Sequence, residues 1–266
     1  MHIVALQAFR DNYIWMIHDS RSAVVVDPGD AGPVLAACAP GGLPAADGRA
    51  PQGLQLAGIL VTHHHPDHTG GIAELLRHRA VPVWGPAGED IGGVSRQVGG
   101  GDSFELDAPR LRFDVLDVPG HTLGHIAYHC PSLAVVLCGD TLFSAGCGRL
   151  FEGTPGQMLE SLERLGSLPD NTQVLCAHEY TVSNLQFARR VEPGNADTEE
   201  YERWCLRQRS ELLPTLPSSI ARERRVNPFL RSDQPGIRAQ LREHFGRDPV
   251  DRVDAFAMLR QWKNDF

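Results

Sequence analysis

Lysine is almost absent from this chain, since its 25 basic residues include a single lysine, Lys263. Cysteine is also sparse: the 266 residues contain six cysteines, and no two of them form a C-x-x-C pair. Several of the six lie in apolar, strand-like runs. We therefore expect them to be buried, reduced thiols.

The N-terminus lacks the features of a targeting signal. The segment that starts at Met1 opens directly into a strand-like run, with no charged n-region, no long apolar stretch and no cleavage site. We expect neither export nor a membrane span, which leaves the cytoplasm. The hydrophobic content of 42% is enough for a sizeable core and favours one large or two small globular domains.

Excess positive charge is missing as well. The formal net charge of −8 disfavours a protein that binds nucleic acid or a membrane surface through non-specific electrostatics. The charge is uneven, however, because residues 201–266 hold 13 basic and 9 acidic side chains. This pattern is compatible with an anionic ligand between a basic tail and an acidic body, and also with a solvated basic face.

Histidine, in contrast, is concentrated. Four of the twelve histidines lie in the segment from Thr62 to Gly71. The apolar run before it, residues 58–61, predicts a buried strand, and the pattern after it, residues 70–76, predicts a helix. The histidines therefore lie in a loop between a strand and a helix, where functional groups of α/β sheets converge.

The spacing of these residues suggests a metal site rather than a solvated histidine-rich loop. His63 and His65 point the same way at the end of a strand, so they can bind one ion while His64 faces elsewhere. Asp67 and His68 follow the turn and are placed to reach a second ion. Imidazole and carboxylate suit zinc, iron and manganese, and the ligand types do not choose among them.

Other strand ends carry side chains of the same kinds. His121 and His178 each follow a predicted strand, and Asp140 follows the apolar run 134–138, which is typical of a central strand buried on both faces. A carboxylate there is costly to bury unless it is paired or metal-bound, so Asp140 is a candidate bridge between two cations. Asp27 also ends an apolar strand, where it either supports the metal loop or serves as a turn residue.

Three short strand patterns at residues 3–9, 13–18 and 23–29 predict an antiparallel or mixed meander. Thr154 and Gln157 form a capping box that opens a helix with an apolar stripe. We expect further helices over residues 184–191 and 197–213, the second opened by Asp197 and Glu200 as another capping box. We interpret residues 40–53 as a surface insertion. The change of character near residue 180 predicts a catalytic domain over 1–180 and a mainly helical, substrate-binding domain over 181–266.

The ordered set of metal-type residues resembles the metallo-β-lactamase superfamily, and nearly the whole chain is similar to the hydroxyacylglutathione hydrolases (glyoxalase II). Beyond the histidine loop, the likeness is carried by residues 146–154, 177–181 and 226–231 and by the C-terminal Arg260-x-x-Lys263-x-x-Phe266. The resemblance implies an α+β fold: an αββα sandwich followed by a small, mainly helical C-terminal domain that closes over the metals.

The resemblance also implies the role of each residue. Two divalent cations per chain, zinc by expectation with iron or manganese possible, would be bound by His63, His65 and His121 at one site and by Asp67, His68 and His178 at the other. Asp140 would bridge them, and Asp67 and Asp140 would be the catalytic carboxylates. Glutathione would be contacted by Arg149, Tyr180, Arg260 and Lys263. Phe151 departs from the pattern, because some members have a tyrosine there.

Two cations about 3.5–4 Å apart lower the pKa of a bridging water and hold a hydroxide at neutral pH. The implied reaction is the attack of this hydroxide on S-D-lactoylglutathione, which yields glutathione and D-lactate in the second step of methylglyoxal detoxification. The alternative is a mononuclear-iron persulfide dioxygenase of the same superfamily, in which Asp67, His68 and His178 would be spare. We expect a monomer with a small-molecule substrate and neither a nucleic-acid nor a membrane partner.

Overall fold

The computed structural model describes residues 1–43 and 53–266. Most of the expected insertion over residues 40–53 lies outside the described residues. The chain forms two compact units, one of residues 1–117 and 124–139, the other of residues 118–123 and 140–266. These compact units are defined by contacts between residues. The predicted division into residues 1–180 and 181–266 concerns catalysis and substrate binding, so this division stays a prediction.

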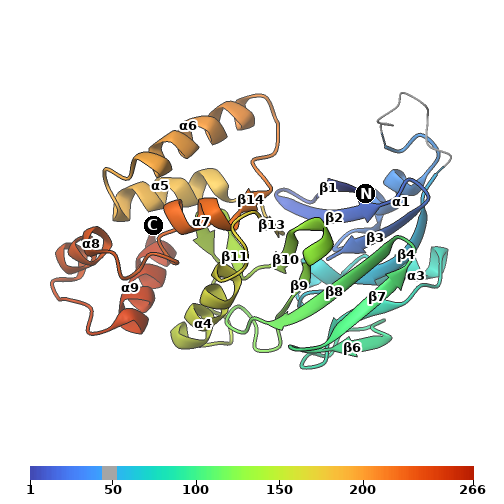
Figure 1. Cartoon of the computed structure of the whole chain (residues 1–266), viewed down its shortest axis with the longest axis horizontal. Coiled ribbons are helices and arrows are strands. Elements are labelled where there is room, and N and C mark those ends of the chain that lie inside the picture. The colour runs from blue at the N-terminus through green and yellow to red at the C-terminus, as the bar shows by residue number, and fades with distance from the viewer. Residues whose placement is uncertain (44–52) are drawn as a thin grey trace. The chain divides into compact units, whose positions relative to one another are not determined.

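The first unit contains a mixed sheet in the order β1 to β6 (Figure 1). The strands β1 (His2–Ala8), β2 (Asn12–His18) and β3 (Ser22–Val26) form an antiparallel meander. The strands β4 (Gln55–Leu60), β5 (Val83–Pro86) and β6 (Arg96–Val98) continue the sheet in parallel. The prediction of a meander in an antiparallel or mixed sheet is confirmed.

A second set of strands in the same unit is antiparallel throughout. It consists of β7 (Ser103–Asp107), β8 (Arg110–Asp117), β9 (Ile126–Cys130) and β10 (Val135–Gly139), with the short 3-10 turn η1 (Pro131–Leu133) before β10. All five residues of β10 are buried, as the unbroken apolar run predicts. The two sets of strands are in contact, because the ring of Trp84 stacks on that of Phe104 at 5.0 Å and Tyr128 donates a hydrogen bond to the carbonyl of Val61 at 2.8 Å.

Helices α1 (Ala31–Cys38) and α3 (Ile72–His78) cover the other face of the mixed sheet. Val34, Ile72 and Leu75 of these helices join one buried core with Met16 and Ile59 of the strands. The one-turn helix α2 (Pro66–Thr69) lies between β4 and α3. This arrangement fixes the end of β4, from which the histidine loop departs.

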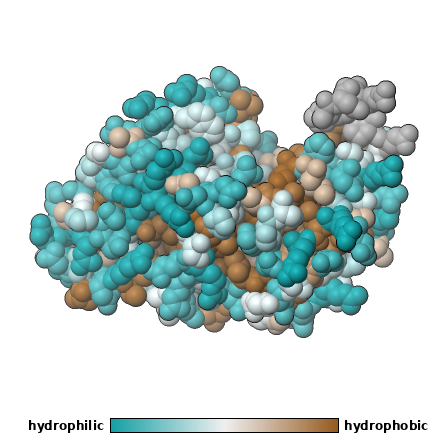
Figure 2. Space-filling model, viewed as in Figure 1, coloured by the Kyte–Doolittle hydropathy of each residue, from teal (hydrophilic) through white to brown (hydrophobic). Residues whose placement is uncertain are grey.

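The second unit is mainly helical. It contains the hairpin β11 (Leu142–Phe143) and β12 (Gly146–Cys147), the pair β13 (Gln173–Cys176) and β14 (Ser218–Ser219), and six helices among its residues: α4 (Pro155–Gly166), α5 (Thr181–Val191), α6 (Ala196–Ser210), α7 (Ile220–Val226), α8 (Pro235–Phe245) and α9 (Arg252–Asp265). Leu185, Tyr201 and Val226 join α5, α6 and α7 in one core. Figure 2 shows that hydrophilic residues predominate over the outer side of α6.

Local signals in the sequence decide how two of these helices begin. The capping box of Thr154 and Gln157 opens α4 as predicted. The capping box predicted at Asp197 and Glu200 is wrong, because Asn195 caps α6 by accepting a hydrogen bond from the amide of Thr198 at 3.2 Å. Asn195 is as good a capping residue as Asp197, and it directly follows the Pro193–Gly194 turn that separates α6 from α5.

Five of the six cysteines are buried and Cys38 is half-buried, in line with the prediction from their apolar context. Among residues 1–43 and 53–266, none of the helices combines the length and the apolar character that crossing a bilayer requires.

Candidate metal and substrate site

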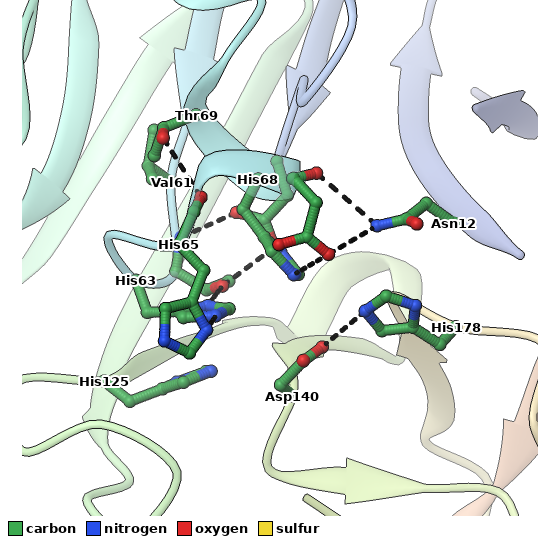
Figure 3. Close-up of polar contacts among 12 residues, drawn as sticks. Asn12, Val61, His63, His65, His68, Thr69, His125, Asp140 and His178 are labelled. Carbon is green, nitrogen blue, oxygen red and sulfur yellow. Dashed lines mark hydrogen bonds and ion pairs between the residues drawn. The ribbon is translucent and has the colours of Figure 1, made fainter. Parts of the chain in front are cut away.

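The first unit presents the ligand-type side chains of the histidine loop from the end of β4 (Figure 3). Nε2 of His63 and Nδ1 of His65 lie 3.1 Å apart. His64 places its Nδ1 3.0 Å from the carboxylate of Glu89. The prediction that His63 and His65 lie together is confirmed, and His64 has a different polar partner, although its ring also lies 5.0 Å from that of His65.

A buried carboxylate, Asp27, lies behind the loop. Thr62 donates its backbone N–H and its hydroxyl to this carboxylate at 2.7 and 2.8 Å. Because the hydroxyl proton of Thr62 points to Asp27, its oxygen accepts from Nδ1 of His63 at 3.0 Å. The proton of the His63 imidazole is thereby held on Nδ1, and the lone pair needed for a metal lies on Nε2.

Asp27 also approaches a second histidine, since its Oδ2 lies 3.1 Å from Nδ1 of His68. Nε2 of His68 lies 3.5 Å from Oδ2 of Asp67. The Asp67 carboxylate is itself held by Asn12, whose side-chain amide donates to Oδ2 at 3.0 Å. Of the two interpretations of Asp27, the structure supports the metal loop, because the carboxylate contacts both loop segments that carry ligand-type histidines.

The second unit brings His121, Asp140 and His178 together. Oδ2 of Asp140 lies 3.4 Å from Nε2 of His121. Oδ1 of Asp140 lies 3.2 Å from Nε2 of His178 (Figure 3). Nδ1 of His121 donates to the backbone carbonyl of Arg149 at 2.9 Å, which directs its Nε2 towards Asp140. One carboxylate thus offers a different oxygen to each of two imidazoles.

The donor geometry of both clusters fits divalent cations. A tetrahedral ion with metal–nitrogen bonds of about 2.0–2.1 Å places its ligand atoms about 3.3 Å apart, close to the separations of 3.1 to 3.5 Å found here. In the pair of His121 and Asp140, Nε2 of a neutral imidazole would offer its lone pair beside a carboxylate oxygen, and a cation between the two atoms would be bound by both.

The side chains expected to contact glutathione lie in the second unit. Lys263 is half-buried and donates to the backbone carbonyl of Ser183 at 3.1 Å. Burial lowers the pKa of Lys263 to about 8, and repulsion from Arg260 and from Arg149 adds to this effect. Mutual repulsion identifies these three side chains as one group of positive charge, which favours an anion.

Arg260 differs from the other two cations. Its side chain is only 5% exposed and donates to the backbone carbonyl of Cys147 at 2.9 Å. Its guanidinium also lies over the ring of Phe229, 5.1 Å from the centroid. These contacts give Arg260 a packing role, whereas Arg149 is exposed. The contact of each with glutathione stays a prediction.

Two aromatic residues cover the second-unit histidines. The ring of Tyr180 stacks on His178 with centroids 4.8 Å apart and an angle of 4° between the planes. Phe151, which is 62% exposed, meets His121 edge to face at 5.2 Å. Each ring covers one side of an imidazole. Phe151 makes this contact with its ring, so the contact does not need the hydroxyl group that a tyrosine would add at this position.

Sequence reasoning did not predict the role of Asn12 or of Thr62, or the ring contact of His125 with His63, which stack at 4.5 Å. The position of Thr62 directly before His63 was the available signal for that residue. Asn12 lies 55 positions from the side chain it holds, so local spacing carries no sign of its role.

Comparisons with known proteins agree with these observations. Residues 8–178 match the model of the metallo-β-lactamase superfamily, and residues 179–266 match that of the hydroxyacylglutathione hydrolase C-terminus. The chain is 52% identical over 269 residues to a hydroxyacylglutathione hydrolase of Albidiferax ferrireducens, with all of both chains covered. It is 48% identical over 264 residues to one of Nitrosomonas eutropha, which covers 99% of this chain and 98% of the relative.

A crystal structure of the protein TTHA1623 in a di-iron-bound form is similar as well. It is 26% identical to this chain with a TM-score of 0.56, and the match covers 86% of this chain and 100% of that protein.

Proposed function

Because the chain belongs to the hydroxyacylglutathione hydrolases of the metallo-β-lactamase superfamily, we propose that it hydrolyses S-(2-hydroxyacyl)glutathione thioesters to glutathione and a hydroxy acid. S-D-lactoylglutathione, which releases D-lactate, is the expected substrate, and detoxification of methylglyoxal is the expected role. The full-length similarity to relatives named for this activity supports the reaction class.

We assign two divalent cations to the seven residues His63, His65, Asp67, His68, His121, Asp140 and His178. The observation that carries this assignment is the placement of Asp140, whose two oxygens face two different imidazoles at 3.4 and 3.2 Å. A single ion would leave one of these oxygens without use. Asp67 and His68 are also oriented as ligands, by Asn12 and Asp27, which a mononuclear centre would not need.

When bound, such cations lower the pKa of water towards neutrality and polarise a carbonyl group. The residues of the chain would orient the metal ligands and bind the substrate. Asp27 would orient His68 directly and His63 through Thr62, and the carbonyl of Arg149 would orient His121. Arg149 and Lys263 would bind the carboxylates of the glutathione moiety, remote from the thioester, and Tyr180 would line the site over His178.

Zinc is the cation we expect, with iron or manganese as substitutes, since imidazole suits zinc and iron. The buried cysteine thiols are in keeping with a reducing compartment, and we place the protein in the cytoplasm. We expect it to act as a monomer.

The test is a panel of thioesters assayed together with metal analysis of the same sample. We expect lactoyl-glutathione to be hydrolysed faster than acyl-coenzyme A, with two metal equivalents per chain. His68→Ala should lose one equivalent and most of the activity. His64→Ala is the matched control, because His64 lies in the same loop but its imidazole contacts Glu89. This variant should keep both metal equivalents and its activity. Full activity with one equivalent, and no gain from a second, would contradict the dinuclear proposal.

A further inference from the structure

In the β11–β12 hairpin, residues 142–147, the backbone of residues 143–147 is held by side chains of the helical region and not by the pairing of the two strands alone. Its backbone groups bond to Asn184 of α5, to Glu223 of α7, to Asn227 at the end of α7 and to Arg260 of α9. Such density of side-chain bonds around five residues is unusual, because most backbone groups in proteins bond to other backbone groups or to water. The hairpin therefore depends on the helices for its conformation.

Glu223 is the centre of this arrangement. It is fully buried, and burial raises the pKa of its carboxyl. Oε2 accepts from the amide of Ala145 at 2.8 Å and from the side-chain amide of Asn227 at 2.9 Å, while Ser218 donates its hydroxyl to Oε1. Ala145 has a φ of 55°, a left-handed conformation that a non-glycine residue keeps only when its surroundings impose it.

Asn227 binds the other side of the same turn. Its side-chain amide donates to the carbonyl of Gly146 at 2.9 Å and to that of Phe143 at 3.2 Å. Its own oxygen accepts from the amide of Phe229 at 3.0 Å, which fixes the orientation of the group. Together, Glu223 and Asn227 bind an amide and two carbonyls of the hairpin.

The two ends of the hairpin lead to residues assigned to the reaction. Gly148, directly after it, donates to the carbonyl of Thr141 at 3.1 Å, and a Cβ at Gly148 would lie 1.9 Å from the carbonyl oxygen of Asp140. The next residue, Arg149, accepts from Nδ1 of His121. A shift of the hairpin would therefore move the carbonyl that orients His121 and the backbone that carries Asp140.

We propose that Glu223 and Asn227 are positioning residues, which act through the hairpin to fix the ligand atoms of His121 and Asp140 and the placement of Arg149. The proposal deepens the proposed function and rests on it for the roles of those three residues. The positioning of His121 and Asp140 can be tested by metal affinity alone, without an assay of thioester hydrolysis.

The experiment measures the affinity of the metal-free full-length protein for Zn²⁺ by titration against a chelator, alongside kcat and KM for lactoyl-glutathione. Glu223→Ala and Asn227→Ala should weaken Zn²⁺ binding by about 10- to 100-fold, the usual effect of removing a group that supports metal ligands. Glu223→Gln should restore most of the affinity, because one amide oxygen can still accept from both Ala145 and Asn227.

Ser218→Ala is the matched control. It removes a hydrogen bond to the same buried carboxylate but none to the hairpin, so it should lower the thermal midpoint of unfolding while Zn²⁺ affinity stays within about twofold. If Asn227→Ala does not fold, Asn184→Ala replaces it, since Asn184 donates to the hairpin carbonyl of Ser144 at 3.1 Å.

Unchanged Zn²⁺ affinity in the Ala variants would overturn the proposal. So would a loss of affinity in Ser218→Ala that equals theirs, because the effect would then follow stability alone. A wild-type protein that binds Zn²⁺ but does not hydrolyse the thioester would refute the proposed function, while the affinities of the variants would still decide the positioning role.

Discussion

The carboxylate of Asp27 lies 3.1 Å from the imidazole of His68, with Oδ2 facing Nδ1. The same carboxylate accepts both donors of Thr62, the residue that precedes His63. One buried acidic group thus orients histidines that the proposed function assigns to two different cations. Removal of the Asp27 carboxylate should therefore weaken the binding of both cations.

We predict that Asp27→Ala lowers Zn²⁺ affinity by about 10- to 100-fold, because the tautomer and ring orientation of His68 and of His63 are no longer imposed. Titration of the metal-free protein measures the effect. Asp30→Ala is the control: Asp30 caps α1 three residues later, and its loss should cost about 1 kcal/mol of stability with no change in affinity. Equal affinities for the two variants would contradict the role of Asp27.

Asp140→Ala should cost more activity than any single histidine substitution, since a bridging carboxylate serves both cations while each histidine serves one. The measurement is kcat together with metal content for the variants of Asp140, His121 and His178. Asp140→Asn keeps the size and one acceptor oxygen, so we expect it to lose less metal than Asp140→Ala. Equal losses of activity with both metals retained would refute the bridge.

Lys263 gives substrate binding a dependence on pH. Its pKa, lowered to about 8 by burial and then by Arg260 and Arg149, means that the positive charge is lost as the pH rises through about 8. We expect KM for lactoyl-glutathione to rise between pH 7 and pH 9.5 in the wild type. Lys263→Gln should show a KM about 10-fold higher at pH 7 and little change above it, because the charge is missing at every pH.

The control for this prediction is a small uncharged thioester, whose KM should be the same in both proteins at each pH. Lys263→Arg keeps its charge throughout the range and should have a KM independent of pH. A wild-type KM that rises equally for the charged and uncharged thioesters would place the titrating group elsewhere.

Arg260→Ala should act on stability first. The variant leaves the carbonyl of Cys147 without its charged donor and removes the packing on Phe229, so we expect the free energy of unfolding to fall by about 2–3 kcal/mol. Denaturant unfolding measures it. Lys263→Ala serves as the comparison and should change stability by less than about 1 kcal/mol, because the burial of its ammonium is itself unfavourable. An equal fall in the free energy of unfolding in both variants would contradict the packing role of Arg260.

The sequence by itself determined the local part of this protein. The spacing of His63 and His65 predicts that these two lie together, the Thr154–Gln157 pair opens a helix, and an unbroken apolar run predicts that β10 is buried. Each of these follows from residues a few positions apart, within reach of backbone periodicity and capping. The side-chain types that suit a metal ion were recognisable from the sequence for the same reason.

Only the tertiary structure decided which groups hold these candidate ligand residues in place. Asn12 supports Asp67 across 55 positions, and Asn227 binds the carbonyl of Phe143 across 84. It also placed Arg260 in the interior, where its side chain is only 5% exposed. Periodicity along one element fixes the direction in which a side chain points, but the partner it meets depends on how distant elements pack against each other.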